Sequence, residues 1–237
     1  MISQPLSKEW REWVKVNVDR GCSLDVIYYT YVKACGGSIE LEQAVAEFKK
    51  KHEVIPTYTE KGFIKEKADP ELVLEIQEFY QANKANGVLE KVPGGFVHDI
   101  AGHPASEVVE LPDKLREKIQ QWLKPRAEEW AGVFLFPTYV YGLRVYTRGA
   151  VLDLHRDREE THIIGVVLNI EQQSEVDWPL EIEDHAGKKH SLVMEPGELL
   201  LYESALLEHG RPAPFEGDRF VNVFCHFMPR EPLEVAL

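Results

Sequence analysis

Apolar and polar positions follow two different spacings along the chain. Up to about residue 130 the apolar side chains recur every three or four positions, which is typical of helices that bury one face. From Phe134 onward they alternate with polar side chains, which is typical of strands. Helices followed by a series of short strands predict one α+β fold.

Five helices are expected in the first part of the chain. Their ranges are 6–18, 26–34, 38–51, 72–81 and 114–130. Pro125 is expected to kink or break the last of them, because proline removes a backbone donor. The first three form a helical annex, 1–55, whose expected role is to pack on the main domain or on another subunit.

Six strands are expected after the helices. Their ranges are 138–146, 161–170, 180–182, 190–194, 198–202 and 219–227. Their number and spacing fit a jelly roll, in which one sheet folds over another and few strand edges stay open. We therefore expect a domain over 56–237 with its jelly-roll core at about 134–230.

Composition narrows the classes of function. The 237 residues carry a formal net charge of −13, which repels phosphate backbones and argues against a nucleic-acid partner. No apolar run approaches the ~20 residues of a membrane span, and no secretory signal is visible, so we expect a cytoplasmic protein without a membrane partner. The 3 cysteines include no Cys-x-x-Cys pair and are expected to be reduced thiols. The oligomeric state stays open.

One strand end carries the clearest chemical signal. His155 and Asp157 are two positions apart, so both side chains can point at one common atom. A neutral imidazole beside an ionised carboxylate suits an intermediate metal such as Fe(II). His209, which follows a second strand-like run, is the candidate third ligand.

Asp153 is the competing carboxylate. It lies on the same alternation face as His155, and we interpret it as a rim carboxylate paired with Arg148 or Arg156. The remaining histidines lack metal-binding spacing and are expected to be surface or packing residues: His52, His98, His103, His162, His185, His190 and His226.

Arg219 is the candidate anchor for an anion. On alternation it shares a face with Val221, Val223 and Cys225, which suit a barrel interior. An inward guanidinium needs a partner, and a planar carboxylate matches its geometry. Arg211 competes for this role, but it stands in a proline-containing turn, so the sequence favours Arg219.

These residues together resemble a known family. The pattern is similar, over about residues 139–227, to that of the Fe(II)- and 2-oxoglutarate-dependent oxygenases, and within them to the prolyl 4-hydroxylase-like branch. The features that carry the resemblance are, in order, Tyr146-x-x-Gly149, His155-x-Asp157, His209 and Arg219.

The resemblance implies a fold and a set of roles. The fold would be a double-stranded β-helix, the cupin-like form of the jelly roll, with N-terminal and flanking helices. Fe(II) would be held by His155, Asp157 and His209. The co-substrates would be O2 and 2-oxoglutarate, which would chelate the metal and pair its far carboxylate with Arg219.

Other residues near the motif are candidates for the remaining contacts. Relatives often carry a tyrosine on the strand that here contains Val166 and Val167, so Tyr146, or else Tyr139, is expected to supply a hydroxyl to 2-oxoglutarate. Tyr139 is also a candidate for substrate binding. Arg144 is another, because alternation places it on the face of Tyr146.

The implied reaction is hydroxylation of an unactivated C–H bond with release of succinate and CO2, since relatives that halogenate lack the carboxylate that Asp157 supplies. A prolyl or other residue of a peptide or protein is the favoured substrate, with loops over 84–103 and 172–178 lining a groove. A free amino acid or other small metabolite is the alternative, which would need a closed pocket with a clamp such as Arg144. A catalytically silent cupin-like scaffold that holds a metal is the third hypothesis, and an intact Arg219 argues against it.

Overall fold

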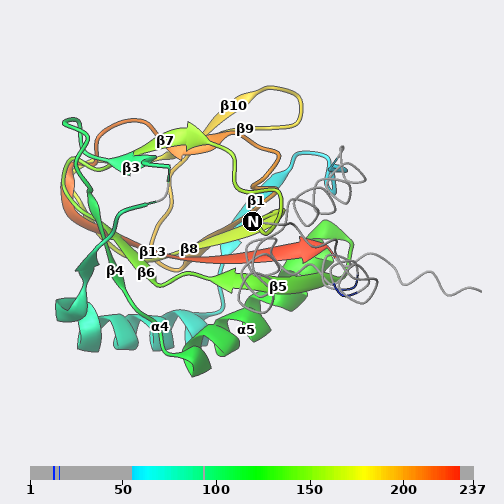
Figure 1. Ribbon diagram of the computed structural model, residues 1–237, viewed down its shortest axis with the longest axis horizontal. Coiled ribbons are helices and arrows are strands. Elements are labelled where there is room, and N and C mark those ends of the chain that lie inside the picture. Colours follow the sequence, from blue (N-terminus) through cyan, green and yellow to red (C-terminus); the bar gives the residue numbers. More distant parts are fainter. Residues whose placement is uncertain (1–12, 14–15, 17–54, 93, 230–237) are drawn as a thin grey trace, which may run out of the picture.

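The fold is described from a computed structural model that covers residues 13, 16, 55–92 and 94–229. Two β-sheets face each other, and helices α4 and α5 lie under the outer face of the larger sheet, which gives three layers (Figure 1). This architecture confirms the predicted α+β jelly roll. The annex predicted over 1–55 lies outside the described residues, apart from Trp13, Val16 and Ile55.

Both sheets are built from antiparallel pairs. The larger, eight-stranded sheet has the order β1 (Phe63–Lys67), β11 (Glu198–Tyr202), β8 (Ile164–Ser174), β13 (Gly217–Pro229), β6 (Leu143–Tyr146), β4 (Ser106–Val109) and β2 (Val88–Leu89), with β5 (Leu135–Val140) also paired to β13. The smaller, five-stranded sheet has the order β10 (Lys189–Leu192), β9 (Leu180–Glu183), β12 (His209–Arg211), β7 (Val151–His155) and β3 (Val97–His98).

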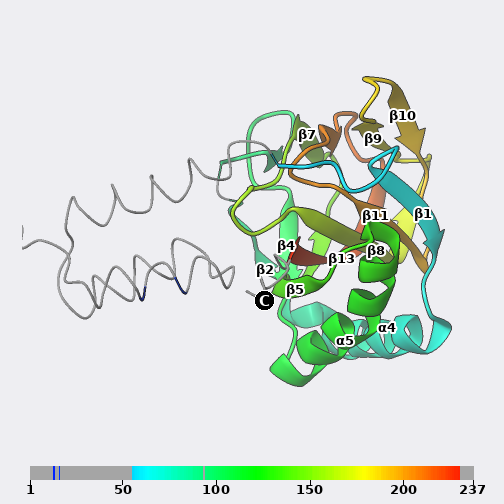
Figure 2. The same cartoon turned by 90° about the vertical axis from the view of Figure 1, so that its right-hand side faces the viewer.

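Two helices stabilise the larger sheet from outside, and Figure 2 shows them side by side on the side away from β7 and β9. Helix α4 (Pro70–Asn83) begins with a proline, and the side chain of Asp69 accepts a hydrogen bond from the Glu71 amide, as an N-cap should. A one-turn 3-10 helix, η1 (Lys84–Asn86), follows it. Among the described residues, no helix is long and apolar enough to cross a membrane.

Helix α5 (Asp113–Ala131) contains Pro125 without a break. Of the two outcomes expected at this proline, a kink or a break, the break does not occur. Apolar residues on both sides of it, Ile119 and Ala127, are fully buried in the same core, so packing outweighs the lost hydrogen bond.

Strand β13 is buried on both faces. Val221, Val223 and Cys225 pack in the core beneath the two helices, whereas the alternate residues point toward the smaller sheet. The prediction that Val221 and its neighbours line the barrel interior is therefore wrong. It failed because β13 is covered on both sides, so apolar residues on one face do not show that this face is the inner one.

The segment predicted as one strand over 138–146 forms two, β5 and β6. The ladder is interrupted at Tyr141 and Gly142, where one extra residue is accommodated, and both strands pair with β13 in the same direction. Gly142 is required at this interruption, because a Cβ there would lie 2.9 Å from the backbone oxygen of Val109. The break directs Arg144 and Tyr146 into the space between the sheets.

Candidate metal centre

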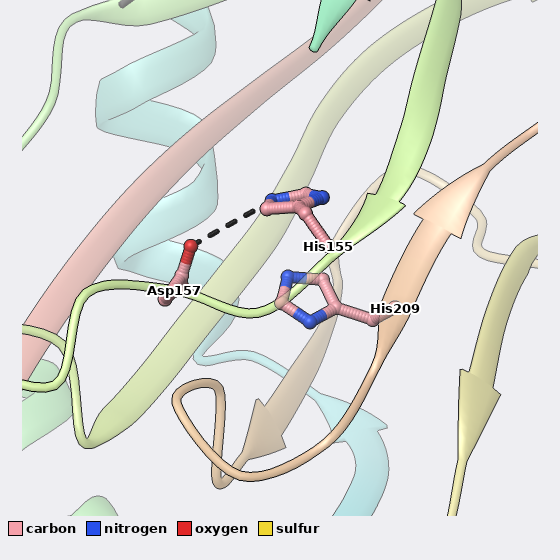
Figure 3. A group of neighbouring side chains, drawn as sticks. All are labelled: His155, Asp157 and His209. Carbon is pink, nitrogen blue, oxygen red and sulfur yellow. Dashed lines mark ion pairs between the residues drawn. The ribbon is translucent and has the colours of Figure 1, made fainter. Parts of the chain in front are cut away.

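His155, Asp157 and His209 come together between the two sheets. His155 ends β7, Asp157 follows in the next loop, and His209 begins β12 directly opposite His155 (Figure 3). One ligand atom from each lies within 4.8 Å of the others, and the Nε2 of His155 is 3.7 Å from the Oδ1 of Asp157. Two imidazoles and one carboxylate are the donors of the facial triad that binds Fe(II), so this donor set fits the implied metal.

Backbone carbonyl groups fix the orientation of both imidazoles. The Nδ1 of His155 is 2.8 Å from the oxygen of Asp153, and the Nδ1 of His209 is 2.9 Å from the oxygen of Leu207. A carbonyl only accepts hydrogen bonds, so each Nδ1 carries the proton and donates it. Each Nε2 therefore keeps a lone pair for a metal.

A β-bulge places His155. Along the pair of strands, His155 lies opposite His209 and Leu152 lies opposite Arg211, so three steps on β7 match two on β12. Leu152 and His155 therefore both line the cavity although they are three residues apart. Gly210 makes this possible, because a Cβ there would lie 2.7 Å from the backbone oxygen of Asp153.

The bulge also turns Asp153 out of the site. Its side chain is half-exposed and lies 3.0 Å from the Nε2 of His98. The expected pairing with Arg148 or Arg156 is wrong: Arg148 pairs with Glu175 and Asp218, and no ion pair joins Asp153 to Arg156 among the described residues. The backbone oxygen of Asp153 does contribute to the site, because it accepts a hydrogen bond from His155.

The buried surroundings set the charges of the ligands. Burial lowers the pKa of His209 to about 4. Burial alone would raise the pKa of Asp157, but the neighbouring His226 and His209 hold that pKa below its usual range. At neutral pH His209 is thus neutral and Asp157 ionised, which are the forms that bind a metal.

Stability of the metal-free protein is expected to fall as pH drops from about 7.5 to about 5. In the fold His209 has a pKa of about 4 and His162, also lowered chiefly by burial, of about 3. Both are about 6.5 in the unfolded chain, so between these values the unfolded state binds more protons and lower pH favours unfolding. At pH 5 each group lowers the free energy of unfolding by about 2 kcal/mol relative to pH 7.5.

Denaturant unfolding at the two pH values measures this dependence. His162→Gln is expected to remove roughly half of it, because His209 remains. An unfolding free energy that stays constant between the two pH values would contradict the expectation.

Arg211 is the buried cation beside the triad. It lines the same cavity and is 1% exposed, although it was predicted to stand in a turn. Its Nη1 donates to the backbone oxygen of Trp178, and its guanidinium lies 4.8 Å and 4.6 Å from the rings of Trp178 and Phe220. Burial lowers its pKa to about 10. Among the described residues, no carboxylate pairs with it, and its Nη2 has no hydrogen-bond partner.

Tyr146 completes this corner of the cavity. The residue is fully buried, and its hydroxyl has no hydrogen-bond partner in the described part of the chain. Its ring packs against Trp178 at 5.1 Å between centroids, and the guanidinium of Arg211 lies over the same Trp178 ring at 4.8 Å. An unpaired guanidinium nitrogen and an unpaired hydroxyl in one dry corner match the two contacts that a ligand carboxylate needs.

Arg219, the predicted anchor, lies elsewhere. Its Nε donates to Glu171 at 2.5 Å, its side chain is 35% exposed, and it does not line the cavity. The prediction that it points into the barrel is wrong, because its face of β13 is the one covered by the helices and not the one that faces the smaller sheet. It shares the helix-covered face with Val221, where Glu171 neutralises it.

Arg144 does line the cavity, as alternation predicted, but it already has a counter-ion. Its Nε and Nη2 donate to the two oxygens of Glu90 at 2.7 and 2.6 Å. Tyr139 is 48% exposed on β5 and does not line the cavity, so the structure does not bring it to the site. Tyr141, whose hydroxyl donates to Glu90 at 2.5 Å, lines the cavity instead.

Sequence reasoning missed two histidines. His162 and His226 were expected to be surface or packing residues, yet both line the cavity, and their ring centroids are 3.7 Å apart. The available signal was alternation along β13, since His226 shares a face with Asn222 and Phe224. The sequence alone places that face outside, because it assigns Val221, Val223 and Cys225 to the barrel interior.

Comparisons with known proteins bear on the fold. No protein-family model matches the chain, and no curated protein matches it in sequence. A prolyl hydroxylase from Trichoplax adhaerens, in complex with a hypoxia inducible factor peptide fragment, is 13% identical with a TM-score of 0.53, over 78% of this chain and 92% of that chain.

Two further solved structures are similar. The viral collagen prolyl hydroxylase from Paramecium Bursaria Chlorella virus-1 is 11% identical with a TM-score of 0.52, over 73% of this chain and 98% of that chain. The non-heme alpha ketoglutarate dependent epimerase SnoN from nogalamycin biosynthesis is 11% identical with a TM-score of 0.57, over 76% and 85%. The chain therefore has the fold of the 2-oxoglutarate- and Fe(II)-dependent oxygenases, prolyl hydroxylases among them.

Proposed function

We propose that the protein is an Fe(II)- and 2-oxoglutarate-dependent oxygenase that hydroxylates an unactivated C–H bond. The observation that carries the proposal is the coincidence, in one cavity, of a His-Asp-His group with a buried arginine that has no carboxylate partner among the described residues. The first suits Fe(II), and the second requires an anion. A dicarboxylate that also chelates the metal satisfies both.

The residues of the chain would divide the work as follows. His155, Asp157 and His209 would hold Fe(II) on one face, and with 2-oxoglutarate and O2 the iron would supply the oxidising power for C–H hydroxylation, with succinate and CO2 released. Arg211 and Tyr146 would bind the far carboxylate of 2-oxoglutarate, the role first expected of Arg219. The aromatic rings around Arg211 exclude water, which strengthens this ion pair.

A residue of a peptide or protein, such as proline, is the substrate we favour. The cavity measures about 230 Å³, whereas sites that enclose a whole small molecule usually measure about 300–1,000 Å³. Once 2-oxoglutarate is bound, little space remains, so a side chain entering from outside fits better than an enclosed metabolite. Arg144, the clamp expected for a metabolite, is also already neutralised by Glu90.

A free amino acid or small metabolite remains the second candidate, and a silent metal-binding scaffold the third. Among the similar structures, one holds a peptide fragment and another is an epimerase of nogalamycin biosynthesis, so this fold serves both substrate classes. Screening peptides and metabolites for faster consumption of 2-oxoglutarate separates the first two. A protein that binds metal but never forms succinate would be the scaffold.

Anaerobic loading with Fe(II) and 2-oxoglutarate tests the proposal. The wild-type protein is expected to show the visible charge-transfer band of a chelated 2-oxo acid, and then to form succinate when O2 is admitted. His155→Ala is expected to show neither, because two ligands make a weak site. A wild-type protein without the band, or a band of full intensity in His155→Ala, would overturn the proposed function.

A further inference from the structure

The two carboxylate oxygens of Asp157 lie in different surroundings. Oδ1 faces the Nε2 of His155, whereas Oδ2 is buried and, within the described residues, has no hydrogen-bond partner. The nitrogen that faces Oδ2 is the Nε2 of His226, at 3.5 Å. A buried carboxylate oxygen without a hydrogen-bond donor lowers the stability of the fold. We therefore expect the arrangement around Oδ2 to serve the function of the site.

Given the function proposed above, the number of coordination positions on the metal indicates a role for the surroundings of Oδ2. An octahedral Fe(II) site has six positions, and a bidentate 2-oxo acid with O2 needs three of them. Three protein ligands leave those three open only if Asp157 binds through one oxygen. Were Oδ2 to bind as well, one position would be lost to the co-substrates.

The proton on His226 can be assigned from its surroundings. If Nδ1 carried it, the Nε2 lone pair would face the carboxylate, and a buried N–H would have no acceptor, because Nδ1 lacks a hydrogen-bond partner among the described residues. A buried N–H without an acceptor is rarer in proteins than an acceptor without a donor. The Nε2–H form is therefore favoured, and it points a donor at Oδ2.

The ring of His226 is also held firmly. The residue is 6% exposed and lies on β13 between Gly165 of β8 and Tyr139 of β5, inside the larger sheet. Its ring packs against that of His162 at an angle of 34°, and the Nδ1 of His162 is 2.5 Å from the hydroxyl of Thr161. A donor fixed on a central strand can position a neighbouring carboxylate more accurately than one on a loop.

We propose that His226 is a positioning residue that keeps Asp157 a one-oxygen metal ligand by donating its Nε2–H to Oδ2. It does not touch the metal itself. Its effect is to keep open the position that the co-substrates require.

Binding of Co(II) alone, without 2-oxoglutarate, tests this role apart from catalysis. His226→Phe is expected to raise the Kd for Co(II) by about 10- to 100-fold, as loss of a partner to a metal ligand does. The visible Co(II) spectrum is expected to change with the coordination of Asp157. His226→Gln, which retains an amide donor, is expected to recover most of the affinity. His98→Phe is the matched control, since His98 pairs with the exposed Asp153, and its Kd should stay within about twofold of wild type.

A measurement on the wild-type protein decides the question even if His226→Phe does not fold. In the Zn(II)-loaded protein, long-range ¹H–¹⁵N NMR is expected to show the His226 proton on Nε2. A proton on Nδ1, or a His226→Phe protein with wild-type Co(II) affinity and spectrum, would overturn the inference while leaving the proposed function intact. A wild-type protein that binds no metal would overturn both.

Discussion

Arg211→Met is expected to raise the KM for 2-oxoglutarate by about 100-fold or more, which corresponds to ~3 kcal/mol for the loss of a buried charge pair. The same substitution should leave the free energy of unfolding unchanged or higher. In the absence of ligand the guanidinium is a buried charge with no carboxylate partner among the described residues, and methionine, which matches the unbranched part of the side chain, removes that cost. Titration of 2-oxoglutarate and denaturant unfolding measure the two effects.

Arg219→Met is the matched control. Because Arg219 pairs with Glu171 outside the cavity, its loss should cost at most about 1 kcal/mol of stability and leave the KM for 2-oxoglutarate within about twofold. The reverse result, with a large KM effect in Arg219→Met and a small one in Arg211→Met, would show that the co-substrate binds as the sequence alone suggests.

Glu90→Gln is expected to lower the free energy of unfolding by about 3–5 kcal/mol. Glu90 is 8% exposed and accepts hydrogen bonds from Arg144, Tyr141 and Ser106. Burial would raise its pKa, but the ion pair with Arg144 and these hydrogen bonds lower it. Glutamine keeps the shape but leaves the buried Arg144 without a counter-charge.

Two further variants show whether charge is the cause. Replacing both partners, Glu90→Leu with Arg144→Met, should restore much of the stability, since an apolar pair leaves no charge buried. Arg148→Ala removes an ion pair that is exposed, and should cost at most about 1 kcal/mol. A loss below about 1 kcal/mol in Glu90→Gln would contradict the expectation.

Periodicity predicted helices α4 and α5 and most strands after Phe134, and missed the strands before Phe134 and the short β12. Helix α4, helix α5 and most of the strands after Phe134 show a clear spacing of apolar residues over five or more positions. Strands β2, β3 and β12 have 2, 2 and 3 residues, too few for any period to be seen. They exist because neighbouring strands supply hydrogen-bond partners, which is a tertiary effect.

Local spacing likewise predicted one part of the candidate site, and tertiary packing determines the other part. His155, Asp157 and His209 were predicted from local spacing, and the structure brings them together. The sequence assigns the co-substrate anchor to Arg219, because it places Arg211 in a proline-containing turn. This assignment fails because β12 is short and β13 is buried on both faces. Which face of β13 is inside depends on helices α4 and α5, which lie far away in the sequence.

The two-sided burial of β13 also means that hydrophobicity does not fix how the strand aligns with its neighbours. A slip by one residue would exchange its two faces, and both faces are buried, so the need to bury the strand does not exclude it. Such a slip would place Asn222 and His226 under the helices, away from Asn169 and Asp157, their present neighbours. Burying these two polar side chains without their partners would cost free energy, which disfavours the misaligned pairing. Residues of the candidate site therefore also help the chain to select one sheet alignment while it folds.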